Sequence, residues 1–282
     1  SSDVCSSDLL GRVVIENYLL IFLRRMKIMN KLSFENFNGK AQIYAQTRSS
    51  YSNNYLNIFC KHLVSQTDSC VADIAAGTGI NTKLISKYCR LVYAIEPNKD
   101  MLNQCRKNCQ EIENIKFIEK TSEETGLPNK SVNIITIAQA FQLLDLEKTK
   151  KECQRILKKS GKVILIWNSK ESKNDFFYET EKVLLQFCPL YKRSIHVMDF
   201  KQSSFSNFFS KPPEFYKFID DGVHFLTKTE FIGRALCASY SLPKSNNNYN
   251  AYIDALDHVY DKFSVNGLVY APLSTIIYVG EI

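Results

Sequence analysis

Short apolar runs alternate with longer helical periods between residues 69 and 168. Strands are predicted at 70–75, 91–96, 115–120, 132–138 and 162–168. Between them, the apolar spacing predicts helices near 84–88, at 99–109 and at 146–157. Near-continuous apolar strands separated by helices are typical of a parallel sheet that is covered on both faces. The pattern therefore predicts a doubly wound α/β domain.

The regular alternation of predicted strands and helices ends after residue 168. An amphipathic helix is predicted up to Pro189, followed by an aromatic-rich segment and a strand at 214–220. Two more helices are predicted, one from about Thr229 and one at 249–263, before a closing strand at 274–282. We expect 170–265 to contain a helical lid that binds a substrate. The two late strands would complete a seven-stranded, mostly parallel sheet.

The N-terminal segment does not share this patterning. Its first residues, SSDVCSSDL, resemble the in-frame translation of a sequencing-adaptor oligonucleotide, and the following stretch resembles an untranslated leader. We therefore expect 1–28 to be non-native and the folded domain to span 29–282, with Met29 as the start and Met26 as the alternative. A targeting segment is disfavoured, because the apolar stretch at 18–23 is short of the about 20 residues that span a bilayer.

Composition narrows the class of protein. Hydrophobic residues make up 45% of the chain and charged residues 23%, which is ordinary for a globular domain and argues against a membrane protein. The net charge is +7, but the lysines are scattered rather than gathered on one face, which disfavours nucleic acid as a partner. The nine cysteines form no C-x-x-C pair and no zinc spacing, so we expect reduced thiols, no metal and a cytoplasmic location.

The stretch VADIAAGTG at 71–79 places an acidic residue in an apolar strand and two glycines after it. Such a loop lets a ligand approach the backbone closely. A dinucleotide would require G-x-G-x-x-G, and the third glycine position holds Thr82. A carboxylate at Asp73 favours a cationic ligand such as S-adenosylmethionine. Glu96, at the end of the second strand, is placed to accept both ribose hydroxyls.

Several motifs in this order carry a family resemblance. VADIAAGTG, AIEPNKDML, GLPNKSVNIITIAQAFQLLD and RILKKSGKVILIWN resemble the class I S-adenosylmethionine-dependent methyltransferases. The likeness is to the small-molecule branch that includes trans-aconitate and ubiquinone/menaquinone methyltransferases, and it covers about residues 33–282. The resemblance implies a Rossmann-like sheet, S-adenosylmethionine as cofactor, and methyl transfer to a small-molecule acceptor through a carboxylate or hydroxyl oxygen.

The resemblance also assigns roles to residues. For the cofactor these are Asp73 and the loop for the methionine part, Glu96 for the ribose, and further residues around the adenine and sulfonium: Tyr44, Arg48, Ala75, Ala76, Gly77, Thr78, Gly79, Pro97, Asn98, Met101, Thr121, Ser122, Gln139 and Ala140. Arg48 would reach the cofactor carboxylate, with a surface salt bridge as the alternative. For the acceptor, candidates are Phe141 and Trp167, which could instead be packing residues, and Arg234 with Tyr240 for an acidic group.

Three departures from the family pattern bear on function. Ala75 stands where the family has a glycine, which is tolerated if its φ is negative. Thr121 replaces a common aspartate beside the adenine, and Gln142 replaces a common histidine. None of the four histidines lies in a motif, so the catalytic base is unassigned.

Other functions on the same fold remain open. A nucleic-acid amino-methyltransferase would carry N/D-P-P-Y/F after the fourth strand, and IAQAFQ lacks it. A protein methyltransferase is a further alternative. A cofactor-binding scaffold without turnover is the non-enzymatic one. We expect a monomer.

Overall fold

The structure is a computed structural model that describes residues 34–63, 68–170, 174–191, 207–219 and 225–282. The segment 1–28, expected to be a non-native leader, lies outside the described residues. Among the described helices, none is long and apolar enough to cross a membrane.

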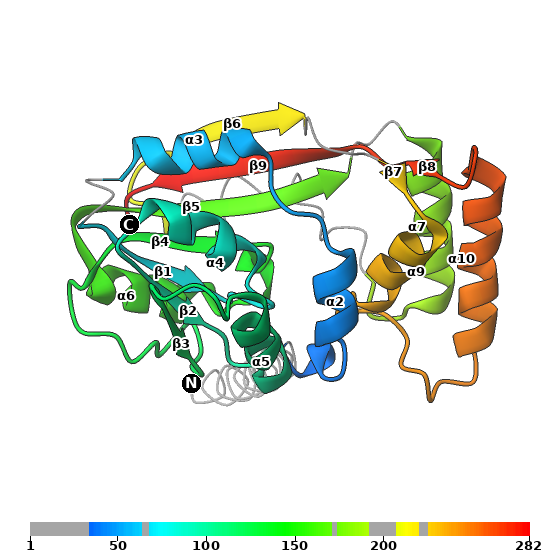
Figure 1. Cartoon of the computed structure of the whole chain (residues 1–282), viewed down its shortest axis with the longest axis horizontal. Coiled ribbons are helices and arrows are strands. Elements are labelled where there is room, and N and C mark those ends of the chain that lie inside the picture. Colours follow the sequence, from blue (N-terminus) through cyan, green and yellow to red (C-terminus); the bar gives the residue numbers. More distant parts are fainter. Residues whose placement is uncertain (1–33, 64–67, 171–173, 192–206, 220–224) are drawn as a thin grey trace, which may run out of the picture.

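A seven-stranded sheet organises the larger lobe, with strand order β3-β2-β1-β4-β5-β9-β6 (Figure 1). Its strands are β1 Cys70–Ile74, β2 Leu91–Ile95, β3 Ile115–Ile118, β4 Val132–Ala138, β5 Leu157–Lys170, β6 Glu214–Ile219 and β9 Leu273–Gly280. The pairs among β1 to β5 are parallel, and β9 runs antiparallel to both β5 and β6. The predicted doubly wound, mostly parallel sheet is confirmed.

Helices cover both faces of the sheet because alternate strand residues point to opposite sides. Val71 packs in the core under α3, α4 and α5, whereas its neighbour Ala72 packs in the core under α6. These helices are α3 Asn53–Lys61, α4 Ile80–Ile85, α5 Lys99–Asn108 and α6 Leu146–Ile156. The strands are therefore buried on both faces, which explains their near-continuous apolar sequence.

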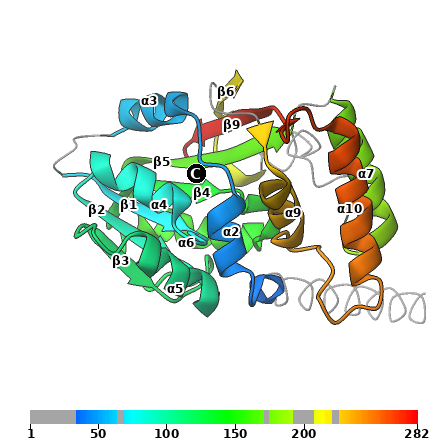
Figure 2. The ribbon, with the colours of Figure 1, turned by 45° about the vertical axis from the view of Figure 1, so that its right-hand side comes forward.

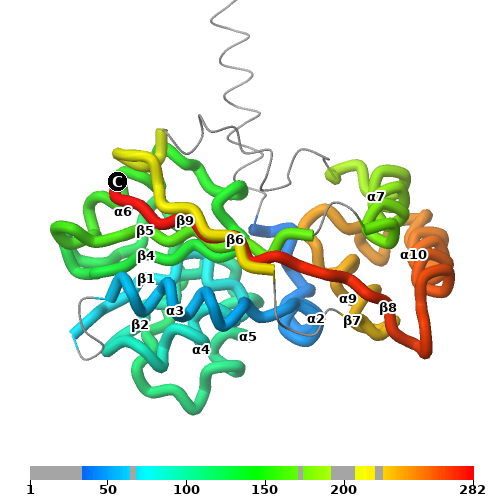
Figure 3. Tube along the Cα trace, turned by 90° about the horizontal axis from the view of Figure 1, so that it is seen from above, coloured from blue at the N-terminus to red at the C-terminus, as the bar shows by residue number. Residues whose placement is uncertain are grey.

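A smaller lobe stands beside the sheet (Figure 2). It contains α7 Asp175–Phe187, α9 Lys228–Leu236, α10 Tyr249–Phe263 and the antiparallel pair β7 Phe225–Leu226 and β8 Val269–Tyr270. Its own apolar core includes Phe176, Phe231 and Tyr252. β9 leads from this lobe back into the main sheet (Figure 3). Helices α7, α9 and α10 and strand β7 lie within 170–265, whereas β8 lies beyond it; the assignment of this segment as a lid stays a prediction.

Helix α2, Ala41–Thr47, joins the two lobes. It lies between the main sheet and α9 in both views (Figures 1 and 2). A Cβ at Gly233 of α9 would lie 2.4 Å from Cγ2 of Thr47, so only glycine allows the two helices to approach this closely. The Arg234 Nε donates to the Thr47 carbonyl at 2.7 Å. The contact fixes the segment after α2 against the smaller lobe.

The sequence pattern missed two helices, α2 and α3, which precede β1. It also missed the short strands β7 and β8. Two-residue strands carry too little periodicity to be recognised. The predicted strand at 162–168 is longer in the structure, where β5 begins at Leu157. A register shift opposite Val132 and Ile134 accommodates the extra residues.

Candidate functional site

The loop after β1 has a positive φ at three positions, of which only Ala75 is not a glycine. Ala75, Gly77 and Gly79 have φ values of 55, 57 and 85°. The condition under which alanine would be tolerated at position 75 without strain, a negative φ, is not met, because the chain turns from β1 into α4 at this residue. A non-glycine residue in this region costs of order 1–3 kcal/mol and is typical of functional sites. At Gly79 a Cβ would lie 2.6 Å from the Cys105 Sγ, so the loop also needs glycine to pack on α5.

Asp73 lines neither of the two cavities at the sheet edge. Its side chain is fully buried, and it accepts hydrogen bonds from Asn81 Nδ2 at 2.7 Å, Thr82 Oγ1 at 2.6 Å and Thr136 Oγ1 at 2.8 Å. Burial raises the pKa of Asp73, and these three donors oppose that effect. The interpretation that its carboxylate neutralises a cationic ligand directly is therefore corrected. Asp73 ties β1, β4 and the start of α4 together and so holds the loop in shape.

Glu96 follows β2 and lines a large cavity of about 940 Å³ at the carboxyl edge of the sheet. Its Oε2 accepts from the Gly77 N–H at 2.8 Å, and its Oε1 accepts from the Asn98 N–H at 2.9 Å. Each oxygen keeps a second lone pair for a ligand hydroxyl. Burial raises the pKa of Glu96 to about 7, against the opposing effect of the two backbone donors.

Residues predicted to surround an adenine line the same large cavity. They are Pro97, Met101, Thr121 and Ser122. Asn98 caps α5, with its side chain accepting from the Met101 N–H at 3.0 Å, and its Nδ2 donates to the Phe34 carbonyl at 2.8 Å. Phe34 and Phe37 also line the cavity, and the sequence analysis missed both.

The predicted loop residues divide into two groups. Ala75, Gly77, Gln139 and Ala140 line the large cavity. Ala76, Thr78 and Gly79 shape the turn and are absent from the walls of both cavities described here. The backbone N–H of Gly77, which lies between Ala76 and Thr78, donates to Glu96.

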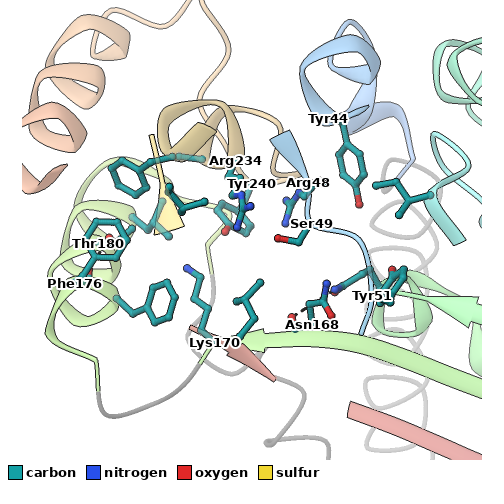
Figure 4. Close-up of a pocket in the computed structure, with 18 residues that line it drawn as sticks. Tyr44, Arg48, Ser49, Tyr51, Asn168, Lys170, Phe176, Thr180, Arg234 and Tyr240 are labelled. Carbon is teal, nitrogen blue, oxygen red and sulfur yellow. Dashed lines mark hydrogen bonds between the residues drawn. The ribbon is translucent and has the colours of Figure 1, made fainter. Parts of the chain in front are cut away.

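A second, small cavity of about 130 Å³ adjoins the first (Figure 4). Tyr44 and Gln139 line both, so the two spaces meet at these side chains. Gln139 has a φ of 61°, a second strained position at this junction. Arg48 lines the small cavity, with its guanidinium 5.0 Å from the centre of the Tyr44 ring and its Nε donating to the Cys237 Sγ at 3.3 Å.

The small cavity brings together main-sheet and small-lobe residues. Arg234 and Tyr240, predicted as acceptor residues, both line it. Sequence reasoning missed Lys170 and Asn168 at the end of β5, and Tyr51 after α2. The position of Lys170 at the carboxyl end of a parallel strand, where ligands bind in such sheets, is the signal that could have found it.

Phe141 and Trp167 lie elsewhere. They are 0% and 1% exposed, belong to the core beneath α6, and line neither cavity. Their rings meet edge to face with centroids 6.1 Å apart, and the Trp167 Nε1 donates to the Gln142 Oε1 at 3.0 Å. The prediction that these aromatics contact the acceptor is corrected, because both side chains are buried in the core on the α6 side of the sheet.

Comparisons with known proteins agree with this architecture. Residues 72–165 match a family described as Methyltransferase domain. A putative methyltransferase of Dictyostelium discoideum is 28% identical over 134 residues, which is 48% of this chain and 49% of that protein. The uncharacterized methyltransferase YcgJ of Bacillus subtilis is 27% identical over 133 residues, 46% of this chain and 53% of the relative.

Two solved structures share the fold. The YcgJ crystal structure superposes with a TM-score of 0.52 at 19% identity, covering 81% of this chain and 99% of that one. A putative type II methyltransferase from Anaeromyxobacter dehalogenans gives 0.57 at 15% identity, covering 83% and 97%. In sequence, the chain spans about half the length of these curated relatives.

Proposed function

We propose that this chain, whose residues 72–165 match a family described as Methyltransferase domain, transfers a methyl group from S-adenosylmethionine to a small-molecule acceptor. The observation that carries the proposal is the pair of adjoining cavities at the carboxyl edge of the sheet. The large one presents Glu96 and the Gly77 loop, and the small one opens from it at Tyr44 and Gln139.

The residues present fit S-adenosylmethionine. The Glu96 carboxylate has free lone pairs toward the cavity for two ribose hydroxyls, and Met101 and Pro97 supply apolar walls for an adenine. The volume of about 940 Å³ falls within the about 300–1,000 Å³ of small-molecule sites. The Arg48 guanidinium, which projects from the segment after α2, would bind the carboxylate of the cofactor.

Methyl transfer would require the protein mainly to position the acceptor against the methyl group of the cofactor. When bound, the cofactor supplies a methyl group already activated on a cationic sulfonium. Tyr44 and Gln139 would flank the passage through which the acceptor meets that methyl group. Orientation of this kind is worth up to about 7–11 kcal/mol of the barrier.

The proposed acceptor atom is a carboxylate or hydroxyl oxygen. No histidine is among the described residues that line the small cavity. A carboxylate acceptor is consistent with this lining because it is already ionised and needs no general base. The small volume supports a small molecule rather than a polypeptide or nucleic acid as acceptor.

The test uses the purified chain. Isothermal titration should detect binding of S-adenosylhomocysteine and none of NAD. Incubation with a metabolite extract and S-adenosylmethionine labelled in its methyl group should then yield a labelled small molecule. Binding of NAD without S-adenosylhomocysteine would contradict the cofactor assignment. Cofactor binding without any labelled product would favour the scaffold alternative.

A further inference from the structure

The small cavity carries an excess of positive charge. Arg48, Lys170 and Arg234 all line it, and its described lining includes no aspartate or glutamate. They come from three segments distant in sequence, and Figure 4 shows Lys170 reaching from the end of β5 toward the side where Arg234 and Tyr240 lie.

These cations have no acidic partner within salt-bridge distance among the described residues. The Arg48 Nε donates to a thiol and the Arg234 Nε to a carbonyl, which leaves their terminal nitrogens without a carboxylate. The Lys170 Nζ lies 5.3 Å from the centre of the Phe177 ring. Buried charges in proteins are normally paired with an opposite charge, so three cations that line one cavity without a carboxylate make that cavity suited to an anionic ligand.

The mutual repulsion of the cations is visible at Lys170. Its pKa is lowered to about 8, first by burial and then by Arg48 and Arg234, while Glu181 on α7 opposes the shift. By its accessible surface Lys170 is an exposed residue, although many protein atoms surround its side chain, so solvent screens much of this repulsion.

The number of cations that line the small cavity exceeds the number of carboxylates that the cofactor would bring. If the proposed function holds, the single carboxylate of the cofactor is taken by Arg48. Lys170 and Arg234 then remain without an anion. The cofactor also brings a cationic ammonium and sulfonium, which make the shared space still more positive.

We propose that the methyl acceptor is a small organic anion, held by Lys170 and Arg234 and contacted on its apolar side by the small lobe. Phe176 and Phe231 provide that apolar wall and belong to the core of the lobe. The inference rests on the proposed function, and adds Lys170 as the residue that selects for charge. A carboxylate and a phosphate monoester would both satisfy the two cations.

Binding of such an anion should depend on pH with a defined sign. An anion favours protonated Lys170, so affinity is full below the pKa of the free site and is lost as the pH rises through it. The groups around Lys170 are Arg48 after α2, Arg234 on α9, Glu181 on α7 and Tyr240. Burial raises the pKa of Tyr240, so it stays neutral in this range.

The experiment titrates probes into the chain saturated with S-adenosylhomocysteine. The probes are benzoate, phenyl phosphate and the neutral isostere benzamide. At pH 7 at least one anion should bind about tenfold or more tightly than benzamide, the scale of a charge-assisted contact. Between pH 7 and 9.5 the affinity for that anion should fall about threefold or more, the direction set by deprotonation of Lys170.

Variants separate charge from structure. Lys170→Met should abolish most of the preference for the anion, whereas Lys170→Arg should keep the preference and lose the pH dependence. Lys87→Met, which removes an exposed charge outside both cavities, is the matched control and should behave as wild type. Thermal unfolding verifies that each variant is folded.

The outcomes are distinguishable. Failure of S-adenosylhomocysteine to bind would contradict the proposed function itself. Cofactor binding together with equal affinity for benzamide and both anions would overturn the inference alone, as would an unchanged preference in Lys170→Met. Tighter binding of phenyl phosphate than benzoate would support the inference and identify phosphate as the preferred group.

Discussion

Protonation of Glu96 should control the affinity for the cofactor. Glu96 is 6% exposed, and burial raises its pKa to about 7 in the empty site. Ribose hydroxyls can donate to the carboxylate but gain less from the protonated acid. Binding should therefore lower the pKa of Glu96 and release a proton. The affinity should be full above pH 7 and should fall as the pH drops below it.

The size of the effect follows from linkage. Each unit by which the pH lies below the free pKa costs up to about 1.36 kcal/mol, or tenfold. Between pH 7.5 and 5.5 the affinity should then fall by up to about 25-fold, for a free pKa of about 7 and a bound pKa below 5.5.

Isothermal titration of S-adenosylhomocysteine at half-unit steps from pH 5.5 to 8 measures this slope. In Glu96→Gln the slope should vanish. At pH 8 the variant should bind roughly 10–150-fold more weakly, because it loses about 1.5–3 kcal/mol of charge-assisted hydrogen bonding. The NH2 group of the glutamine would also replace one carboxylate oxygen, so the backbone N–H of either Gly77 or Asn98 would lose its acceptor.

Glu147→Gln is the matched control. Glu147 lines the same cavity, is mostly exposed and pairs with Lys151, so its replacement should leave affinity and slope unchanged. A wild-type affinity that is constant from pH 5.5 to 8, or a slope that persists in Glu96→Gln, would refute the assignment of Glu96 to the ribose.

Three further substitutions test the structure by urea unfolding and cofactor titration. Gly79→Ala should lower the free energy of unfolding more than Gly77→Ala. Both substitutions place alanine at a positive φ, which costs about 1–3 kcal/mol, but only the Cβ at position 79 would clash with the Cys105 Sγ. Equal losses of stability in the two variants would contradict the close packing of Gly79 on Cys105. Asp73→Asn should cost about 1–3 kcal/mol of stability by presenting an amide to hydroxyl and amide donors, and an unchanged stability would contradict the buried network. Trp167→Phe should cost about 1–3 kcal/mol but spare cofactor affinity, whereas a large loss of affinity would place Trp167 back in the site.

Much of the fold was predictable from local pattern. The apolar strands and amphipathic helices from 70 to 168 follow from side-chain periodicity, and the sheet they form is the predicted one. The helices α2 and α3 were missed. α2 has only seven residues, too short for a clear periodic signal, and it is held by contact with α9 rather than by its own propensity.

The candidate site was predictable to a different degree at each residue. Glu96 was predictable because it follows a strand directly, and ligands bind at the carboxyl ends of the strands of a parallel sheet. Asp73 lies one residue before the end of β1, and its direction depends on which donors the neighbouring α4 and β4 present. The same holds for Trp167, whose inward orientation depends on packing with Phe141.

The sequence by itself determined the alternation of strands and helices from 70 to 168, the glycine loop and the acid that follows β2, because these depend on neighbours along the chain. Only the tertiary structure decided that Asp73 is a buried support, that Ala75 takes a positive φ, and that Arg48, Lys170 and Arg234 converge. Arg48 and Lys170 are more than a hundred residues apart in the sequence, and Lys170 and Arg234 are tens of residues apart. No local sequence pattern therefore indicates that the three side chains lie close together in space. Their convergence follows from α2 packing on α9 beside the end of β5.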